Sequence, residues 1–297
     1  MASPQLTFAI PYYRGLDLLE KAIQSVFSQT QSDWKLLISN DGGPDPALDA
    51  LVARFADSRV TLVHNERNMG MAGNWNACLD RADTPLVTLL HADDELLPNY
   101  TAVVMQAVAD HPDATLYYCQ ASVVDENGQP SFSLPDRVKR FIQPQPVGPY
   151  TQLTGEAALT RLLRGNFIFC PTICYQKSRL GELRFSSDWR FVLDFDLTTH
   201  LLLKEHTFIG INEVAYAYRR HGSNATVEYT QNRLRFEEEI QLFNQLADEC
   251  ARKGWQQARR VAQAKTIIRL NLLYCALTDS LKGHLPNAVQ KLRLLTT

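Results

Sequence analysis

Short apolar runs alternate with amphipathic segments along the first 120 residues, and this alternation is the strongest constraint on the fold. The apolar runs have the length and the Leu, Ile and Val content of buried strands, and they fall at 6–10, 35–39, 60–64, 86–90 and 114–120. The segments between them have apolar residues at helical spacing, at 17–29, 47–55, 71–81 and 98–110. This order predicts an α/β fold, with an open and mostly parallel sheet and helices on both faces.

The alternation ends after Val124. Seven glycine and proline residues between positions 125 and 150 predict a long irregular segment, which we interpret as a functional lid. Helical spacing returns at 155–164 and 191–204. From Gln231 to the end of the chain, the spacing predicts two amphipathic helices that break near Gly254.

Composition narrows the possible functions. Lys and Arg total 30, Asp and Glu total 32, and no basic tract is present, so the net charge of −2 argues against nucleic-acid binding. No segment has the pattern of a signal peptide or of a membrane-spanning helix. The six cysteines are scattered and are expected to be reduced thiols. These features predict a cytoplasmic protein.

Polar and aromatic residues follow four of the predicted strands at the point where each strand ends. In chain order these residues are Pro11, Tyr12, Tyr13, Asp41, Asn68, His91, Asp93 and Asp94. In open α/β sheets, ligands bind at the carboxyl ends of the strands, so the candidate site lies there. The chain has neither GxGxxG after the first strand nor GxxxxGK[ST], which argues against a dinucleotide or P-loop site.

The adjacent carboxylates Asp93 and Asp94 have two interpretations. They could cap the following helical turn, or they could share a divalent cation that removes their mutual repulsion and also binds a diphosphate. Their position directly after a buried strand favours the cation. Asp41 could likewise form an Asx turn with Gly42 or face the N–H edge of a base. Tyr13 could stack on that base or cover the end of the sheet.

Several ordered motifs together resemble the family 2 glycosyltransferases, which are nucleotide-diphosphosugar enzymes of the GT-A fold. The similarity extends from Leu6 to Thr226. Its motifs are AIPYYRGLDLLEKAIQSVFSQT, ISNDGG, RNMGMAGNWNACLDRADTPLVTLLHADDELLP and LDFDLTTHLLLKEHTFIGINEVAYAYRRHGSNAT. The chain departs from the family pattern at His91, which replaces the first Asp of Asp-x-Asp-Asp, and at Gly73, where the family often has Arg.

The resemblance implies a role for each residue of the candidate site. Nucleotide binding is implied for Pro11, Tyr12, Tyr13, Asp41, Asn68, Asn74 and Asp93. Binding of Mn²⁺ or Mg²⁺ is implied for Asp93, Asp94 and His221, and contact with the diphosphate is implied for Arg219 and Arg220.

The catalytic base has three candidates. The family's Asp-aromatic-Asp-Leu run places the base at Asp194, with Asp196 as a close competitor and Asp188 as a weaker one. Alternatively, Asp194 is a helix-start charge that is favoured only by the helix dipole.

The implied activity is the inverting, non-processive and metal-dependent transfer of a sugar from a nucleotide-diphosphate sugar to an acceptor hydroxyl. UDP is the expected nucleotide, and the acceptor could be a glycan, a lipid-linked sugar, a protein or a small molecule. Two rival classes are a metal-dependent nucleotide-sugar pyrophosphohydrolase and a catalytically inactive sugar-nucleotide-binding protein.

The resemblance also implies a division of the chain. Residues 1–226 would form the catalytic domain, with a nucleotide-sugar half at 1–124 and an acceptor half at 125–226. Residues 227–297 would form a helical extension. Its helices could pack on the catalytic domain, form a homodimer or make a peripheral contact with the inner face of a membrane.

Overall fold

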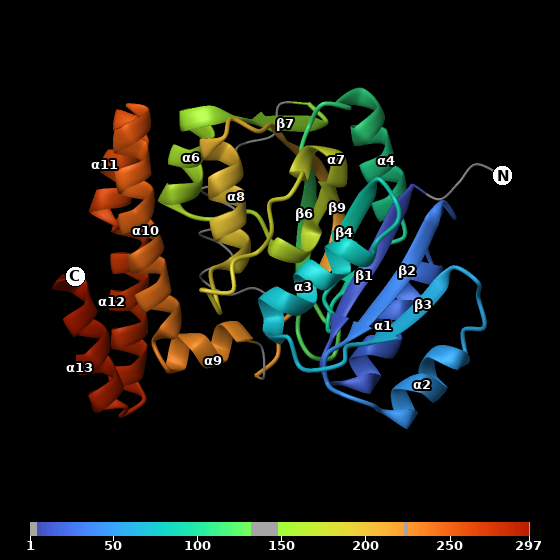
Figure 1. The fold of residues 1–297 in the computed structure, drawn as a ribbon. Coiled ribbons are helices and arrows are strands. Elements are labelled where there is room, and N and C mark those ends of the chain that lie inside the picture. Colours follow the sequence, from blue (N-terminus) through green and yellow to red (C-terminus); the bar gives the residue numbers. More distant parts are fainter. Residues whose placement is uncertain (1–4, 132–147, 223–224, 297) are drawn as a thin grey trace.

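The computed structural model describes residues 5–131, 148–222 and 225–296. Within these residues, nine strands form one sheet with helices on both faces (Figure 1). The strand order is β3-β2-β1-β4-β8-β6-β9-β5, and β7 pairs with β9. The predicted α/β class is therefore confirmed.

The first half of the chain is an all-parallel β-α unit. Its elements lie within a few residues of the predicted ranges, namely β1 (Leu6–Tyr12), α1 (Leu16–Phe27), β2 (Trp34–Asn40), α2 (Pro46–Ala53), β3 (Val60–His64), α3 (Gly70–Arg81), β4 (Leu86–Leu89) and α4 (Tyr100–Asp110). Strand β1 pairs in parallel with β2 and β4, and β2 pairs in parallel with β3. The carboxyl ends of these strands therefore share one edge of the sheet.

The sheet becomes mixed beyond β4, where the sequence predicts it less completely. The elements of this part are β5 (Glu95–Leu96), β6 (Leu116–Val124), β7 (Tyr150–Leu153), α6 (Gly155–Arg164), η1 (Cys170–Thr172), β8 (Ile173–Gln176), α7 (Lys177–Leu180), α8 (Leu193–Leu203) and β9 (Phe208–Arg219). Strand β8 is antiparallel to both β4 and β6, whereas β6 and β9 are parallel. Of the segment predicted to form a lid, residues 132–147 lie outside the described residues.

The C-terminal part contains more helices than the two that were predicted. The described residues form α9 (Ala225–Gln231), α10 (Leu234–Lys253), α11 (Gln256–Ala264), α12 (Thr266–Leu281), α13 (Leu285–Arg293) and η2 (Leu294–Thr296). The predicted break is confirmed, because Gly254 ends α10 with φ 76°. The second predicted helix is divided at Lys265 (φ 49°) and Gly283 (φ 80°), whose left-handed backbone cannot continue a helix.

The sheet separates two hydrophobic cores. Along β1, Phe8 and Ile10 belong to the core beneath α1 and α4, whereas Ala9 belongs to the other, because side chains alternate across a strand. The second core extends from α3 through α6 and α8 into α10, α11 and α12. The C-terminal helices therefore form an outer layer that shares a core with the sheet (Figure 1).

Among the described residues, no helix combines the length and the apolar content needed to cross a bilayer.

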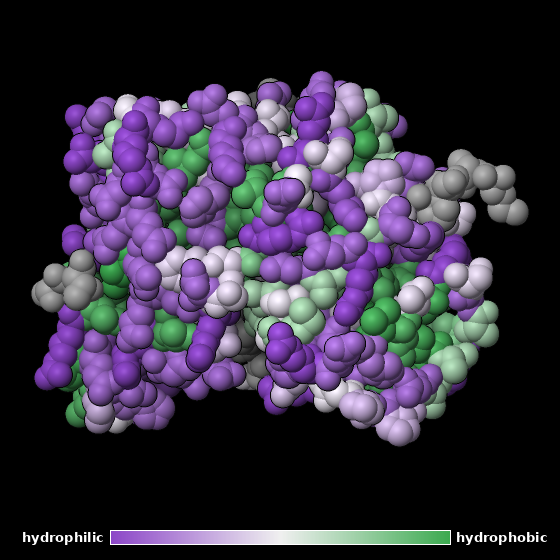
Figure 2. All heavy atoms as spheres, in the orientation of Figure 1, coloured by the Kyte–Doolittle hydropathy of each residue, from purple (hydrophilic) through white to green (hydrophobic). Residues whose placement is uncertain are grey.

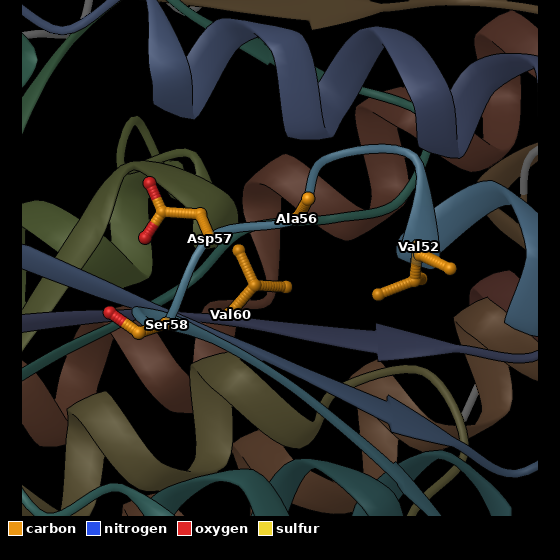
Figure 3. A pocket seen from close by; sticks show the side chains of 6 residues that line it. Val52, Ala56, Asp57, Ser58 and Val60 are labelled. Atoms are coloured by element: carbon orange, nitrogen blue, oxygen red, sulfur yellow. The ribbon is translucent and has the colours of Figure 1, made fainter.

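An open pocket lies at the amino end of β3, between Val52, Asp57 and Val60 (Figure 3). It is at the opposite end of the strand from the candidate site, and the carboxylate of Asp57 is paired with Arg59 at 2.7 Å. We therefore assign no function to this pocket.

Candidate active site

Asp41 follows β2 and holds the loop that leads into α3. Its Oδ1 accepts hydrogen bonds from the Met69 amide and from Asn65 Nδ2, both at 2.8 Å, and its Oδ2 accepts one from the Gly70 amide at 3.0 Å. The residue is only 5% exposed. A carboxylate is stabilised at the start of a helix by unpaired backbone amides. Asp41 therefore fixes the geometry of the loop at the end of β3.

Asn74 lies beneath that loop and connects it to β1 and β2. Its Oδ1 accepts from Ser39 Oγ at 2.6 Å and from Asn65 Nδ2 at 3.1 Å, and its Nδ2 donates to the Ser39 carbonyl at 3.0 Å. Asn74 is 4% exposed, whereas Asn68 is exposed at the loop surface and accepts from the Gly70 amide. Asn68 and Asn74 were both predicted to bind the nucleotide, but Asn68 lies at the surface of the site and Asn74 is buried beneath it.

The two tyrosines at the end of β1 also separate. Tyr12 is 2% exposed and belongs to the core, whereas Tyr13 is 58% exposed. The loop after β2 passes close to Tyr13, since a Cβ on Gly42 would lie 2.4 Å from the Tyr13 carbonyl oxygen. Gly42 is therefore required for this close approach between the Asp41 loop and the Tyr13 backbone. Pro11, which precedes both tyrosines, is half-buried.

Asp94 is buried and is held by β9. Its Oδ1 accepts from the Arg219 amide at 2.7 Å and its Oδ2 from the Tyr216 hydroxyl at 3.1 Å. Burial raises the pKa of Asp94 well above its usual range, and the charge of Asp93 raises this pKa further. Ionisation of both carboxyls therefore requires additional positive charge nearby.

Arg219 is 2% exposed and joins the β4–β5 loop, strand β5 and the loop after β6. Its Nε donates to the Asp93 carbonyl at 3.1 Å, and its Nη1 donates to the carbonyls of Asp125 and Glu126 at 3.0 Å. Its Nη2 forms an ion pair with Glu95. The guanidinium thus binds groups of the chain itself, and its predicted contact with the diphosphate stays a prediction.

Arg220, the next residue, is half-buried. Its amide donates to the Val124 carbonyl at 2.8 Å, and its guanidinium lies 6.0 Å from the centre of the Tyr218 ring. The Tyr218 ring in turn packs on Phe169, with 5.2 Å between ring centres. Arg220 thus lies among aromatic rings at the rim of the site.

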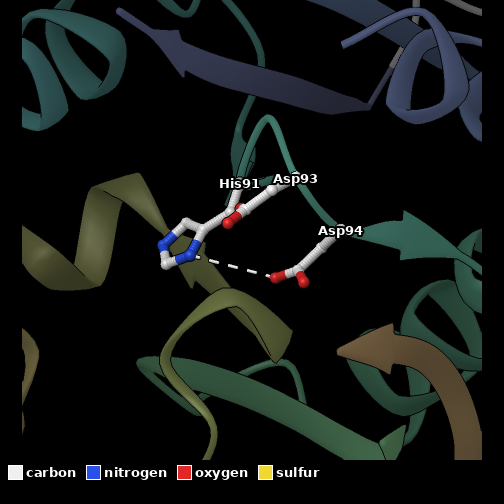
Figure 4. Close-up of side chains that lie close together, drawn as sticks. All are labelled: His91, Asp93 and Asp94. Carbon is white, nitrogen blue, oxygen red and sulfur yellow. Dashed lines mark ion pairs between the residues drawn. The ribbon is translucent and has the colours of Figure 1, made fainter. Parts of the chain in front are cut away.

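Asp93 and two histidines complete the acidic end of the site. Asp93 Oδ2 lies 2.9 Å from His221 Nε2, and His91 Nδ1 lies 3.9 Å from Asp94 Oδ2. One ligand atom from each of His91, Asp93 and Asp94 falls within 4.8 Å of the others, on the loop between β4 and β5 (Figure 4). The sequence prediction placed His91 at this strand end but did not include it among the metal ligands, although its place in the family's Asp-x-Asp-Asp motif was the available signal.

This group of side chains fits a divalent cation. Burial raises the pKa of Asp93, but the His221 hydrogen bond and the charge of His91 outweigh burial and leave this pKa below its usual value. Burial lowers the pKa of His91, which favours the neutral imidazole that binds metals. Carboxylate oxygens with an imidazole suit Mn²⁺ or Mg²⁺. Because the Asp93 side chain is 30% exposed and the Asp94 side chain only 1%, Asp93 is the more accessible ligand.

The candidate bases lie at or before the start of α8 and face different surroundings. The Asp196 carboxylate lies 3.2 Å from His200 Nδ1, and His200 Nε2 lies 3.3 Å from Glu249 of α10. Asp196 is therefore directed into the packing between α8 and α10. Asp194 is partly exposed, and Asp188 is exposed in the loop before the helix.

Asp194 is linked to the metal-binding group through a short series of neighbours. Tyr175 of β8 is fully buried, and its pKa is raised well above the usual value by burial and by the charges of Cys170 and Asp194. Cys170 Sγ in turn lies 3.9 Å from His91 Nε2. The Trp75 ring packs on His91 with 5.4 Å between ring centres, and Trp75 and Tyr175 belong to the same hydrophobic core, so His91 lies on the Tyr175 side of the sheet.

Glu238 of α10 is a site residue that the sequence prediction missed. It accepts hydrogen bonds from the amides of Arg190 (2.9 Å), Phe191 (2.8 Å) and Val192 (3.2 Å), the residues directly before α8. Glu238 is 7% exposed. It thereby caps the helix that carries Asp194. In the sequence it is one of three consecutive glutamates, and no pattern distinguishes it from the others.

The sequence model of "Glycosyl transferase family 2" matches residues 7–164, which is more than half of the chain. The chain belongs to this family. One relative, UDP-Glc:alpha-D-GlcNAc-diphosphoundecaprenol beta-1,3-glucosyltransferase WfgD of Escherichia coli, is 24% identical over 208 residues, covering 70% of this chain and 73% of that protein. A second, the uncharacterised protein y4gI of Sinorhizobium fredii, is 30% identical over 128 residues, but the chain covers only 14% of its length.

Solved structures support the GT-A fold. Staphylococcus aureus TarS 1-349 in complex with UDP-GlcNAc superposes with a TM-score of 0.69 at 15% identity, over 97% of this chain and 79% of that one. The mannosyltransferase PcManGT from Pyrobaculum calidifontis, in complex with GDP-Man and Mn²⁺, has a TM-score of 0.57 at 15% identity, over 99% and 75% of the two chains. This chain is therefore a glycosyltransferase with a GT-A architecture.

Proposed function

We propose that this glycosyltransferase transfers one sugar at a time, with inversion, from a nucleotide-diphosphate sugar to an acceptor hydroxyl in a metal-dependent reaction. The observation that carries the proposal is the group of His91, Asp93 and Asp94 at the carboxyl end of β4. A negatively charged diphosphate can approach acidic side chains only when a cation lies between them. The nucleotide-sugar ligands in the TarS and PcManGT structures support such a donor.

Donor binding is assigned to the residues around the Asp41 loop. Tyr13 is exposed and can stack on the base, and the loop with Asp41 and Asn68 presents polar groups beside it. We propose UDP as the nucleotide, because the WfgD relative uses a UDP-sugar. Asn74 and Arg219 act as positioning residues, and Arg220 contacts the diphosphate.

The reaction is a single displacement at the anomeric carbon. The acceptor oxygen forms a bond to this carbon while the bond to the diphosphate oxygen breaks, and the electron pair leaves with the nucleoside diphosphate. Asp194 takes the proton of the acceptor hydroxyl. Asp93, with His91, His221 and Asp94 nearby, would hold a Mn²⁺ or Mg²⁺ ion, which would supply positive charge for the leaving diphosphate.

The acceptor is assigned to the class of sugars linked to a lipid diphosphate. The name of the WfgD relative specifies such an acceptor, GlcNAc-diphosphoundecaprenol. We also propose that residues 1–226 are the catalytic domain and that 227–297 form an extension that supports its acceptor half. We also propose that the enzyme is located in the cytoplasm, where nucleotide sugars are available to it.

The test combines donor binding with product analysis. UDP-, GDP- and dTDP-sugars are screened with Mn²⁺ and Mg²⁺ by thermal shift, since a ligand that binds only the native state raises the apparent stability. The preferred donor is then incubated with GlcNAc-diphosphate-lipid, and the anomeric configuration of the product is determined by NMR. Inversion with acceptor-dependent release of nucleoside diphosphate is expected. Acceptor-independent release of sugar would indicate a hydrolase, and binding without turnover would indicate an inactive binding protein.

A further inference from the structure

The exposed apolar side chains of this protein are concentrated at its C-terminal end. Within the described residues, 13 large apolar side chains are exposed, and eight of them lie on α12 and α13. Figure 2 shows part of this surface as green among purple at the lower left, over the position of these helices in Figure 1. Single exposed apolar residues are normal, but a contiguous group marks an interaction surface.

Helix α12 is apolar on two opposite faces. One face is buried against the rest of the protein through Ile268, Leu272 and Ala276. The opposite face is exposed and consists of Leu270 (57%), Leu273 (46%), Tyr274 (40%), Leu277 (61%) and Leu281 (80%). These five residues recur every three or four positions, so they form one stripe along the helix. A helix with apolar residues on two opposite faces is normally covered on both of them.

Helix α13 continues this surface. Leu285, Val289 and Leu292 are 60%, 48% and 44% exposed, and their spacing also places them on one face. Leu281 and Leu285 stand on either side of the turn between the two helices. In Figure 1 this turn lies at the same end of the molecule as α9 and the carboxyl ends of β1 and β2. We call the exposed stripes of α12 and α13 the C-terminal apolar face.

The charges around the C-terminal apolar face are of one sign. Arg269, Lys282 and Arg293 are exposed beside it. Asp279 is the only acidic residue after position 265, and its carboxylate is paired with Lys291 at 2.6 Å. This region is therefore basic, although the whole chain has a net charge of −2.

We propose that the C-terminal apolar face docks on the surface of a membrane that contains anionic lipids. An amphipathic helix with basic flanks lies in the interfacial plane of a bilayer, where its leucines enter the acyl boundary and its basic residues meet anionic headgroups. A second copy of the chain fits less well. In a symmetric dimer through this face, Arg269, Lys282 and Arg293 would meet the same cations of the partner.

Membrane docking extends the proposed function. It depends on that proposal in one respect only, namely that the acceptor is linked to a lipid. An acceptor carried on a lipid diphosphate lies at the membrane surface, so docking would bring the enzyme to it. Vesicle binding itself requires neither a donor nor a metal ion. Its measurement in their absence therefore separates failure of the docking proposal from failure of the proposed transfer reaction.

The experiment is flotation of the full chain with two kinds of vesicle, phosphatidylcholine alone and equal parts of phosphatidylcholine and phosphatidylglycerol. The first variant combines Leu277→Gln with Leu281→Gln, and the second combines Arg269→Gln with Lys282→Gln. Val214→Gln is the matched control, because Val214 is a 47% exposed apolar residue on β9. Thermal unfolding of each variant verifies that it is folded, which is expected because all five side chains are exposed.

Wild type and Val214→Gln should float with the anionic vesicles. The leucine variant should lose about tenfold or more of the vesicle partition coefficient, and the arginine–lysine variant should lose the preference for phosphatidylglycerol. Absence of binding by the wild type would overturn the proposal, as would equal binding by wild type and the leucine variant. A dimer in sedimentation that dissociates on the leucine substitutions, without vesicle binding, would instead identify a second copy as the occupant.

Discussion

The donor side and the acceptor side of the site are held in place by different parts of the chain. On the donor side, the partners of Asp41 lie 24 to 29 positions away, within the same β-α unit. On the acceptor side, the start of α8 is held by Glu238, which belongs to α10 and lies outside the part matched by the family model.

This difference has a consequence for function. The β-α unit supplies its own supports around Asp41, whereas its metal-binding group is also held by β9 and by His221. The acceptor side depends on the C-terminal helices, which can change without disturbing the donor side. We therefore expect substitutions in the donor half to alter donor binding, and substitutions in the C-terminal helices to alter turnover while donor binding is preserved.

The largest effect is expected at the acidic end of the donor side. Asp93→Ala removes the most accessible carboxylate of the metal-binding group, and the transfer rate should fall about a thousandfold or more, because charge on the leaving diphosphate is then poorly stabilised. Initial rates with saturating donor and Mn²⁺ provide the measurement. Asp113→Asn is the control, since the Asp113 side chain is 86% exposed. A loss of less than tenfold, with activity that survives a chelator, contradicts the metal assignment.

The next largest effect separates the two aspartates of α8. Asp194→Asn should lower kcat at least about a hundredfold, because the acceptor hydroxyl then lacks a base, while the Kd for the donor stays near that of the wild type. Asp196→Asn should mainly lower the melting temperature, since the Asp196 carboxylate is paired with His200. If Asp196→Asn instead abolishes turnover in a protein of unchanged stability, the two roles are reversed.

The third prediction tests whether the acceptor side is held independently of the donor side. Glu238→Gln weakens the cap of α8, so the free energy of unfolding should fall by about 1–2 kcal/mol. The kcat should fall about tenfold while the donor Kd is unchanged, because only the acceptor side moves. Glu237→Gln is the matched control, since Glu237 is the exposed neighbour on the same helix. An equal rise in donor Kd would show that the two sides are not held independently.

The sequence predicted the donor side better than the acceptor side for a physical reason. Parallel strands are buried on both faces, so continuous apolar runs mark β1, β2 and β4 and also the strand ends where Asp41 and Asp93 lie. The supports of the site, such as Asn74 and Glu238, are ordinary polar residues in helices. Their roles depend on contacts between distant segments, which no local pattern records.

The C-terminal helices were also predicted incompletely from local sequence patterns. The apolar spacing after Gln231 predicted helices correctly, but not the number of breaks. Gly254 is a recognisable terminator because glycine readily adopts a positive φ. The break at Lys265, where φ is 49°, has no such signal, since lysine is a good helix former.

The smallest expected effect is the pH dependence of the contact between α8 and α10. The hydrogen bond to Asp196, together with Asp196 and Glu249 charges, raises the pKa of His200 from 6.5 to about 9, against the opposing effect of burial. The folded state therefore binds the proton more tightly than the unfolded state. The stability from protonated His200 is fully present below pH 6.5 and is lost as the pH rises through about 9.

Because the His200 side chain is 32% exposed, screening by solvent should limit this contribution to about 1 kcal/mol. Chemical denaturation of wild type and His200→Gln between pH 6 and 10 (roughly the range that brackets both pKa values) measures it. The difference in unfolding free energy should be greatest at the acidic end and vanish at the basic end, whereas His284→Gln, which changes an exposed histidine, should leave the curve of the wild type unchanged. A difference independent of pH would mean that His200 stabilises the α8–α10 contact through packing rather than charge.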